Sequence, residues 1–128
     1  MKVEVSNGEL LDKLSILELK LNNIKDNKKL INIKNEHSGL MPLCDNLFKK
    51  YGDELRAFYL KLSEINAELW KIEDDIRECE RNKEFGDEFI RLARAVYFTN
   101  DKRSDMKKSI NLLTESGFVE EKSYEDYK

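Results

Sequence analysis

The apolar residues between Leu55 and Cys79 recur at alternating steps of three and four. This heptad spacing places them on one face of a helix. At a rise of about 1.5 Å per residue such a helix is roughly 37 Å long, which is enough to run the length of a small domain. The apolar face of this predicted central helix comprises Leu55, Phe58, Leu62, Ile65, Leu69, Ile72, Ile76 and Cys79.

An earlier helix is predicted to begin after a short N-terminal arm, residues 1–5. Ser6 followed by Glu9 is a capping box, in which each side chain accepts a backbone N–H at the other end of the first turn. Apolar residues then lie on two sides of the helix, which predicts packing against both another helix of the bundle and a further helix or a second subunit. The first side comprises Leu10, Leu14, Leu17, Leu21 and Ile24, and the second comprises Leu11, Ile16 and Leu19.

Two stretches before the central helix weaken the helical pattern. The first helix either breaks at Asp26-Asn27 or continues as one bent helix to about Asn35, and we favour the bent helix. Gly39 and Pro42 disfavour a helix interior, because glycine costs backbone entropy and proline lacks an N–H group. Residues 36–53 are therefore predicted to be the least regular region, with about two turns of helix over LCDNLFKKY at 43–51.

A further corner is predicted at Asn100-Asp101, between a helix that begins at Asp87 and a short last helix over about 104–114. With one proline and five glycines, the chain has too few turn residues for a β-sandwich or barrel. We therefore predict an all-α fold, a helical bundle of four or five helices with two long antiparallel helices in coiled-coil-like packing. Residues 1–128 are expected to form a single helical domain, with the acidic C-terminal tail 115–128 at least partly docked.

Composition narrows the class of protein. Charged residues make up 38% of the chain, against about 25% in an ordinary protein, yet the net charge is only −3. No basic face indicates nucleic acid, and no signal peptide or membrane-length apolar run is recognisable in the sequence. Cys44 and Cys79 are too few for a disulfide framework or a zinc site. We expect a cytoplasmic protein that binds neither a membrane nor nucleic acid.

Carboxylates beside the central apolar face are candidate ligands for a metal ion. Mg²⁺ and Mn²⁺ prefer oxygen ligands, and helical bundles hold such ions between facing helices. All-helical Mg²⁺-dependent nucleotide pyrophosphohydrolases pair an E-x-x-E helix with an E-x-x-D helix. Here the spacing is E-x-x-x-E and the second acidic group is on the same helix, so the alternative is a solvated face with ion pairs along the helix. The candidate ligands are Glu18, Glu64, Glu68, Glu73 and Asp75.

Two other sets of residues are candidates for binding. A polar run around Asn100 could bind an anion if the last helix begins there with free N–H groups, although a capped corner is the commoner meaning of such a run. Trp70 lies off the heptad face, so it is either covered by another helix or an exposed anchor for a partner. The anion-binding candidates are Arg94, Asp101, Arg103 and Ser104, and the partner-interface candidates are Trp70, Ile16 and Leu19.

Four stretches of the chain resemble a family of small, uncharacterised bacterial and phage helical proteins. They are SNGELLDKLSILELK at 6–20, LWKIEDDIR at 69–77, FIRLARAVYFTNDKRSDMKKSIN at 89–111 and EEKSY at 120–124. The resemblance implies that the EEKSY segment belongs to the domain and that the source is bacterial, phage or marine. It supplies no activity, ligand or catalytic residue.

Two functional hypotheses remain. The favoured one is a non-enzymatic helical interaction module that self-associates or binds a protein partner, as the two-sided first helix and Trp70 indicate. The alternative is a Mg²⁺- or Mn²⁺-dependent hydrolase that acts on a nucleotide or another phosphorylated small molecule through the carboxylates of the bundle. No motif in the sequence names a reaction, so whether the protein is an enzyme stays open.

Overall fold

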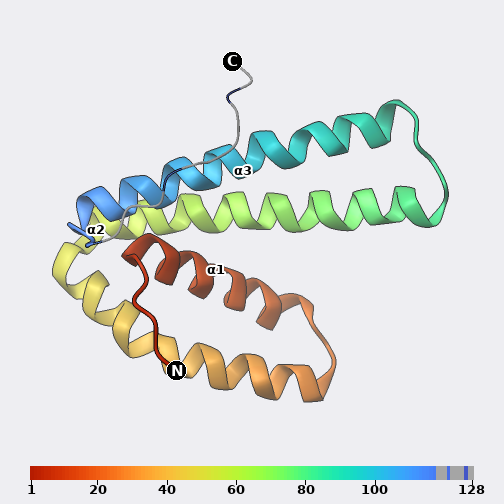
Figure 1. Ribbon diagram of the computed structural model, residues 1–128. Helices are drawn as coiled ribbons and strands as arrows, with labels where there is room; N and C mark the ends of the chain where they lie inside the picture. The colour runs from red at the N-terminus through yellow and green to blue at the C-terminus, as the bar shows by residue number, and fades with distance from the viewer. Residues whose placement is uncertain (118–120, 122–125, 127–128) are drawn as a thin grey trace.

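Three α-helices make up the secondary structure of residues 1–117, 121 and 126, which are the residues that the computed structural model describes (Figure 1). They are α1 (Asn7–Asn23), α2 (Asn27–Arg81) and α3 (Asp87–Leu113). The predicted all-α class is confirmed. The prediction of four or five helices is wrong, because two segments that were expected to interrupt helices are themselves helical.

α2 continues through residues 36–51, so the predicted break at Gly39 and Pro42 is wrong, whereas the two turns of helix predicted over 43–51 are confirmed. Gly39 and Pro42 lie inside the helix despite their poor helix propensity. Cys44 and Phe48, on the same stretch, are buried in the larger apolar cluster of the molecule. Because burial of these two side chains favours the helical arrangement, it outweighs the local cost of the glycine and the proline.

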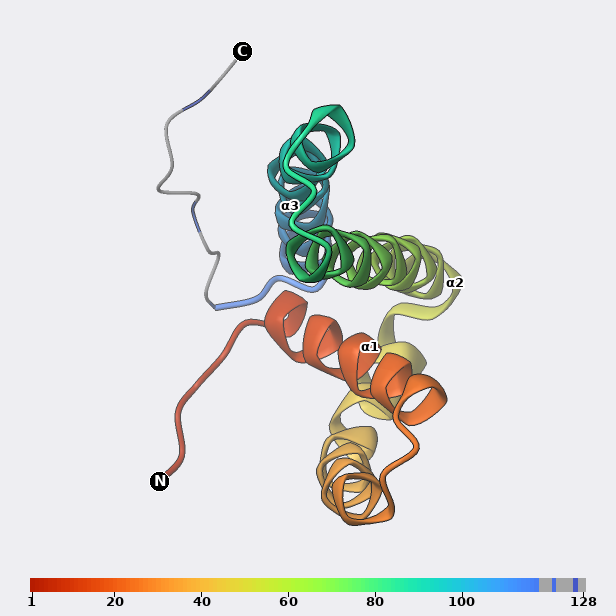
Figure 2. The same cartoon turned by 90° about the vertical axis from the view of Figure 1, so that its right-hand side faces the viewer.

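α2 changes direction at Gly52, which has φ 63° and ψ −142°. This backbone conformation is accessible almost only to glycine. The kink separates residues 27–51 from residues 53–81, and the two halves of α2 lie on either side of α1 (Figures 1 and 2). Much of the apolar surface on two sides of α1 is therefore covered within a single chain, whereas Ile16 and Leu19 are only half-buried.

Replacing Gly52 with alanine is expected to lower the free energy of unfolding by about 1–3 kcal/mol, because a Cβ is strained at this backbone conformation. Gly39 provides the matched control, since it is helical and a Cβ there would meet no atom within 4 Å. Gly39→Ala should therefore raise the stability by about 0.5–1 kcal/mol. Urea denaturation of both variants checks the pair, and equal effects of the two substitutions would contradict the assigned kink.

The chain leaves the helix between α1 and α2, so the favoured single bent helix is wrong and the break at Asp26-Asn27 is correct. α1 ends at Asn23, and Asp26 caps α2. The Asp26 carboxylate accepts hydrogen bonds from the backbone N–H groups of Lys28 (2.9 Å) and Lys29 (3.2 Å). This N-cap stabilises the start of a new helix and explains the break.

The long antiparallel pair is formed by the second half of α2 and by α3 (Figure 1). α3 runs unbroken through Asn100-Asp101, so the predicted corner is wrong. The pairing differs from the expected one, because the first helix is short and lies against both α2 and α3 instead of running along the central helix. Among the described residues, no helix has an apolar stretch long enough to cross a bilayer.

The buried apolar side chains form two separate clusters. The larger cluster joins all three helices through residues such as Leu14, Leu62 and Ile110, whereas the smaller one joins α2 and α3 through Ile72 and Leu92. Along α2 and along α3, buried polar residues lie between the two clusters. This polar section of the core is where the candidate site is found.

The two ends of the chain differ in what the structure describes. Residues 1–5 precede α1 as an exposed, non-helical arm. Most of the predicted tail, including EEKSY apart from Glu121, lies outside the described residues. Glu121 is exposed, and its carboxylate is 3.3 Å from Lys108 Nζ. The docking of the tail stays a prediction.

Candidate functional site

Asp12 is the centre of a polar network that joins the three helices. The residue lies on α1 and is 1% exposed. Its Oδ1 accepts hydrogen bonds from Asn66 Nδ2 of α2 and Arg103 Nε of α3, both at 2.9 Å, and its Oδ2 accepts one from Arg103 Nη2. The side-on, two-bond contact fixes the plane of the guanidinium group. Hydrogen bonding to Asp12 raises the pKa of Arg103, so the arginine stays charged.

Ser15 extends the network by one turn along α1. Its hydroxyl accepts a hydrogen bond from Asn66 Nδ2 (2.6 Å) and donates one to the backbone oxygen of Asp12 (2.8 Å). Asn66 thereby uses its amide nitrogen on two partners of α1 and is 4% exposed. Buried polar groups of this kind specify one arrangement of their helices when their bonds are made.

The first turn of α1 docks on the last turns of α3. Ser6 Oγ caps α1 by accepting from the backbone N–H of Glu9 (3.1 Å), which confirms the Ser6 half of the predicted capping box. The Gly8 N–H donates to Asn111 Oδ1 at 2.6 Å, and Lys107 Nζ is 2.5 Å from a carboxylate oxygen of Glu9. These contacts hold the SNGE segment against the last turns of α3.

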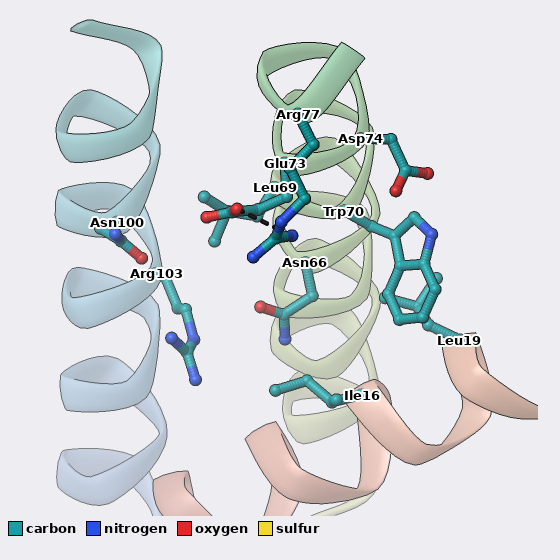
Figure 3. Close-up of a pocket in the computed structure, with 10 residues that line it drawn as sticks. All are labelled: Ile16, Leu19, Asn66, Leu69, Trp70, Glu73, Asp74, Arg77, Asn100 and Arg103. Atoms are coloured by element: carbon teal, nitrogen blue, oxygen red, sulfur yellow. Dashed lines mark ion pairs between the residues drawn. The ribbon is translucent and has the colours of Figure 1, made fainter. Parts of the chain in front are cut away.

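A cavity of about 460 Å³ opens beside this polar network, between the C-terminal part of α1 and the α2–α3 pair (Figure 3). Its size is in the range of sites that take a small molecule or a protein side chain. Asn66 and Arg103 belong both to the network and to the cavity wall. The wall comprises Ile16, Leu19, Asn66, Leu69, Trp70, Glu73, Asp74, Arg77, Asn100 and Arg103.

The charged side chains around the cavity differ in whether they have a partner of opposite charge. Arg103 is paired with Asp12, and Arg77 Nη1 lies 3.1 Å from Glu73 Oε2. Asp74 makes no ion pair with any residue in the described part of the chain. Both cations that line the cavity are therefore paired with carboxylates, whereas the Asp74 carboxylate has no cation beside it among the residues that the structure describes.

Comparison with known protein families gives one assignment. A family model described as a family of unknown function, DUF6165, matches residues 1–127. The chain belongs to this family. No curated protein and no solved structure matches it. The DUF6165 match agrees with the resemblance to an uncharacterised family, and it assigns no activity.

The candidate metal ligands do not come together in this DUF6165 protein. Glu18 accepts a hydrogen bond from the Tyr59 hydroxyl, Glu73 pairs with Arg77, and Asp75 pairs with Lys71 (3.0 Å). The described residues contain no group of three or more histidine, cysteine, aspartate or glutamate side chains that could hold a metal ion. The geometry thus gives the predicted site no support. The two remaining candidates, Glu64 and Glu68, are exposed.

The anion-binding candidates come together only in part. Asp101 and Ser104 lie inside α3 and do not present the free N–H groups of a helix start, so this part of the prediction is wrong. Arg94 lines a separate hollow, with Phe98 and Glu68 among its neighbours. Arg103 and Ser104 line a small hollow of about 90 Å³, but the cation of Arg103 is already paired with Asp12.

The partner-interface candidates are brought together. Trp70 of α2 and both Ile16 and Leu19 of α1 line the same cavity, although they are far apart in sequence. In Figure 3 the Trp70 indole lies above Leu19 of α1. Whether these residues bind a partner stays a prediction, but they share one surface.

Three of the four residues that build the polar network were missed by sequence reasoning, and the fourth, Arg103, was predicted only as an anion-binding residue. Asp12, Ser15 and Asn66 are polar residues in helices whose charged residues are mostly solvated, so nothing singled them out. A weak signal existed: Asp12 and Ser15 are three residues apart and follow Leu11 and Leu14 directly, which places them next to buried positions.

The stability of this protein should fall as the pH rises above about 9. Burial raises the pKa of the Cys44 thiol to about 11, and burial together with the Glu18 contact raises the pKa of Tyr59. Both groups keep their protons up to a higher pH in the folded state than in the unfolded state. Their contribution to the free energy of unfolding is complete at pH values below the pKa that each group has in the unfolded chain. It is lost as the pH rises to the pKa that the group has in the folded protein.

The measurement is urea denaturation between pH 8 and pH 10.5, where Cys44 alone should account for a loss of about 2 kcal/mol. Cys44→Ala is expected to remove that share of the pH dependence, and Tyr59→Phe a smaller one. An unchanged slope in Cys44→Ala would show that the thiol is not the group responsible.

Proposed function

We propose that this protein is a non-enzymatic interaction module that binds a partner polypeptide at the cavity between α1 and the α2–α3 pair. The observation that carries the proposal is the cavity wall itself. An aromatic and aliphatic surface is set beside polar groups whose positions are fixed by a buried network. Protein-binding hot spots combine these two properties, and Trp and Arg are enriched in them.

The aliphatic part of the cavity wall favours binding of a partner, because binding would remove apolar surface from water. Ile16, Leu19 and Trp70 are each only half-buried, so part of their apolar surface faces the cavity. A neighbouring hollow of about 330 Å³ shares Leu19 and Trp70, which extends the surface along α1. A partner segment that fills both would bury this apolar area and gain the usual free energy of its removal from water.

The hydrolase alternative has no comparable support. Its candidate carboxylates are engaged in separate contacts with Tyr59, Lys71 and Arg77, or are exposed. A catalytic metal needs several such oxygens directed at one point. We therefore keep Mg²⁺ or Mn²⁺ chemistry as the second hypothesis only.

We further propose a single-domain protein of a reducing compartment such as the cytoplasm. The larger apolar cluster takes side chains from all three helices, which supports one domain. Cys44 and Cys79 are both free and buried, as is usual for cysteines that serve as small apolar core residues.

Site-specific photo-crosslinking in cells that produce the protein tests the binding site. A photoreactive amino acid replaces Arg77, which lines the cavity and has an exposed side chain. The same probe at Leu112, which is 65% exposed and outside the cavity wall, is the matched control. We expect a defined adduct with another polypeptide from position 77 and not from position 112.

The variant Trp70→Ala should reduce the yield of that adduct, because it removes the aromatic side chain from the cavity wall. Equal adducts from both probe positions, or none from position 77, would overturn the proposed site. An adduct between two copies of this chain would replace the separate partner by self-association through the same surface.

A further inference from the structure

We infer that the cavity receives a basic side chain, arginine or lysine, from the partner polypeptide. This inference rests on the proposed function and specifies the chemistry of its ligand. Three features of the wall carry it: the amide oxygen of Asn66, the carboxylate of Asp74, which has no ion pair within the described part of the chain, and the indole of Trp70. Each is a recognition element for a hydrogen-bond-donating cation on an apolar stem.

Asn66 supplies a hydrogen-bond acceptor on a side chain that is otherwise largely buried. Its nitrogen is bound to Asp12 and Ser15, which fixes the orientation of the amide group. Its oxygen has no hydrogen-bond partner among the described residues, and Figure 3 shows it turned toward the space between α2 and α3. Since no fully buried polar side-chain atom in the described part of the chain lacks a partner, this oxygen is open to the cavity. An acceptor on a residue that is 4% exposed favours a ligand that donates.

The charge around the cavity favours a cation. Arg77 and Arg103 are neutralised by Glu73 and Asp12, whereas Asp74 has no ion-pair partner among the described residues. The α2 wall has the same sign, because residues 53–82 include nine acidic and five basic side chains, whereas residues 83–113, which include α3 on the other wall, have seven basic and five acidic side chains. On the α2 side of the cavity Asp74 would repel a phosphate or carboxylate ligand and attract a basic side chain.

Trp70 supplies an aromatic face for the cation and for its aliphatic stem. It borders both the main cavity and the neighbouring hollow, and Asp74 borders both as well. An arginine or lysine that stacks on an indole gains a cation–π contact, and its methylene groups cover apolar surface such as Leu19. Trp70 and Asp74 are four residues apart on α2, so one side chain can contact both.

Nuclear magnetic resonance titration of the isotope-labelled full chain tests the inference. The probes are the blocked amides of arginine, lysine, glutamine and glutamate, each at millimolar concentration. We expect the arginine and lysine compounds to shift the indole N–H signal of Trp70, which is the only tryptophan, and the side-chain amide signals of Asn66. The glutamate compound should leave both in place.

A charge-removing variant and its matched control complete the test. Asp74→Asn should weaken binding of the arginine compound about threefold, as expected for the loss of one solvent-accessible ion pair. Asp105→Asn removes an exposed carboxylate of α3 outside the cavity wall and should leave the affinity unchanged. Larger shifts with glutamate or glutamine, no shift with any probe, or equal effects of the two variants would overturn the inference.

The outcomes separate this inference from the proposed function. A cavity that prefers glutamine or glutamate, together with a crosslink from position 77, would keep the interaction module and change its ligand. Absence of the crosslink would remove the proposed site whatever the probes do.

Discussion

Replacing Asp12 with alanine is expected to lower the free energy of unfolding by about 3–5 kcal/mol, because the change leaves a partly buried guanidinium without its counter-ion. Asp12 is 1% exposed and accepts hydrogen bonds from Asn66 and Arg103 on two other helices. Removing the carboxylate therefore breaks the polar connection of all three helices at one point. Urea denaturation followed by circular dichroism measures the loss.

The matched control is Asp75→Ala. Asp75 also pairs with a cation, Lys71, but both side chains are well exposed. The loss of such a surface pair is expected to change the stability by less than about 1 kcal/mol. A similar change in both variants, or a loss below about 1 kcal/mol for Asp12→Ala, would show that the buried network does not hold the helices together.

Gly8→Ala is expected to destabilise the protein by about 2–4 kcal/mol, through overpacking and the loss of a buried hydrogen bond. A Cβ at this position would lie 2.5 Å from the backbone oxygen of Lys107 and 2.9 Å from Asn111 Oδ1. Because the nearer atom belongs to the backbone of α3, it cannot move aside cheaply. α1 would have to shift away and lengthen the 2.6 Å bond from the Gly8 N–H to Asn111.

Thermal and urea unfolding of Gly8→Ala, beside the same replacement at Gly39, measure this effect. A Cβ added at Gly39 would meet no atom within 4 Å, so alanine there should stabilise the helix. If Gly8→Ala were neutral, the close approach of α1 to α3 would not exist in solution.

The periodicity of the central helix predicted its buried face well. Every heptad position from Leu55 to Cys79 is buried or half-buried in the structure. The first helix was less predictable: Leu11, off the main stripe, is 0% exposed, whereas Leu10 on the stripe is half-buried. The difference arises because α1 is covered from two sides and α3 meets its first turn, so no single stripe defines its contacts.

The helix breaks were the least predictable feature. Local sequence preferences predict the helix break correctly at Asp26, where a side-chain cap starts α2. They predict breaks at Pro42 and at Asn100-Asp101 that the structure does not have. At Pro42 the burial of Cys44 keeps the chain helical. Contacts of this kind join residues that are distant in sequence, and a propensity that is summed over a short window does not include them.

The candidate site was predictable only in its apolar half. Trp70, Ile16 and Leu19 stood out by their positions on the helices, and the structure places them on one cavity. Asp12 and Asn66 did not stand out, because a polar residue that binds another helix looks the same in sequence as one that binds water. Only the meeting of three helices gives these two residues their role.

One buried network holds α1, α2 and α3 in their relative positions and fixes polar groups of the cavity wall. A double-mutant cycle on Asp12→Asn and Arg103→Gln tests this claim most directly, with the free energies of unfolding measured in urea for the two single variants and the double variant. We predict a coupling energy of about 2 kcal/mol, because the two side chains make charge-assisted hydrogen bonds to each other. Additivity within about 0.5 kcal/mol would contradict the claim, since it would mean that the two residues act independently.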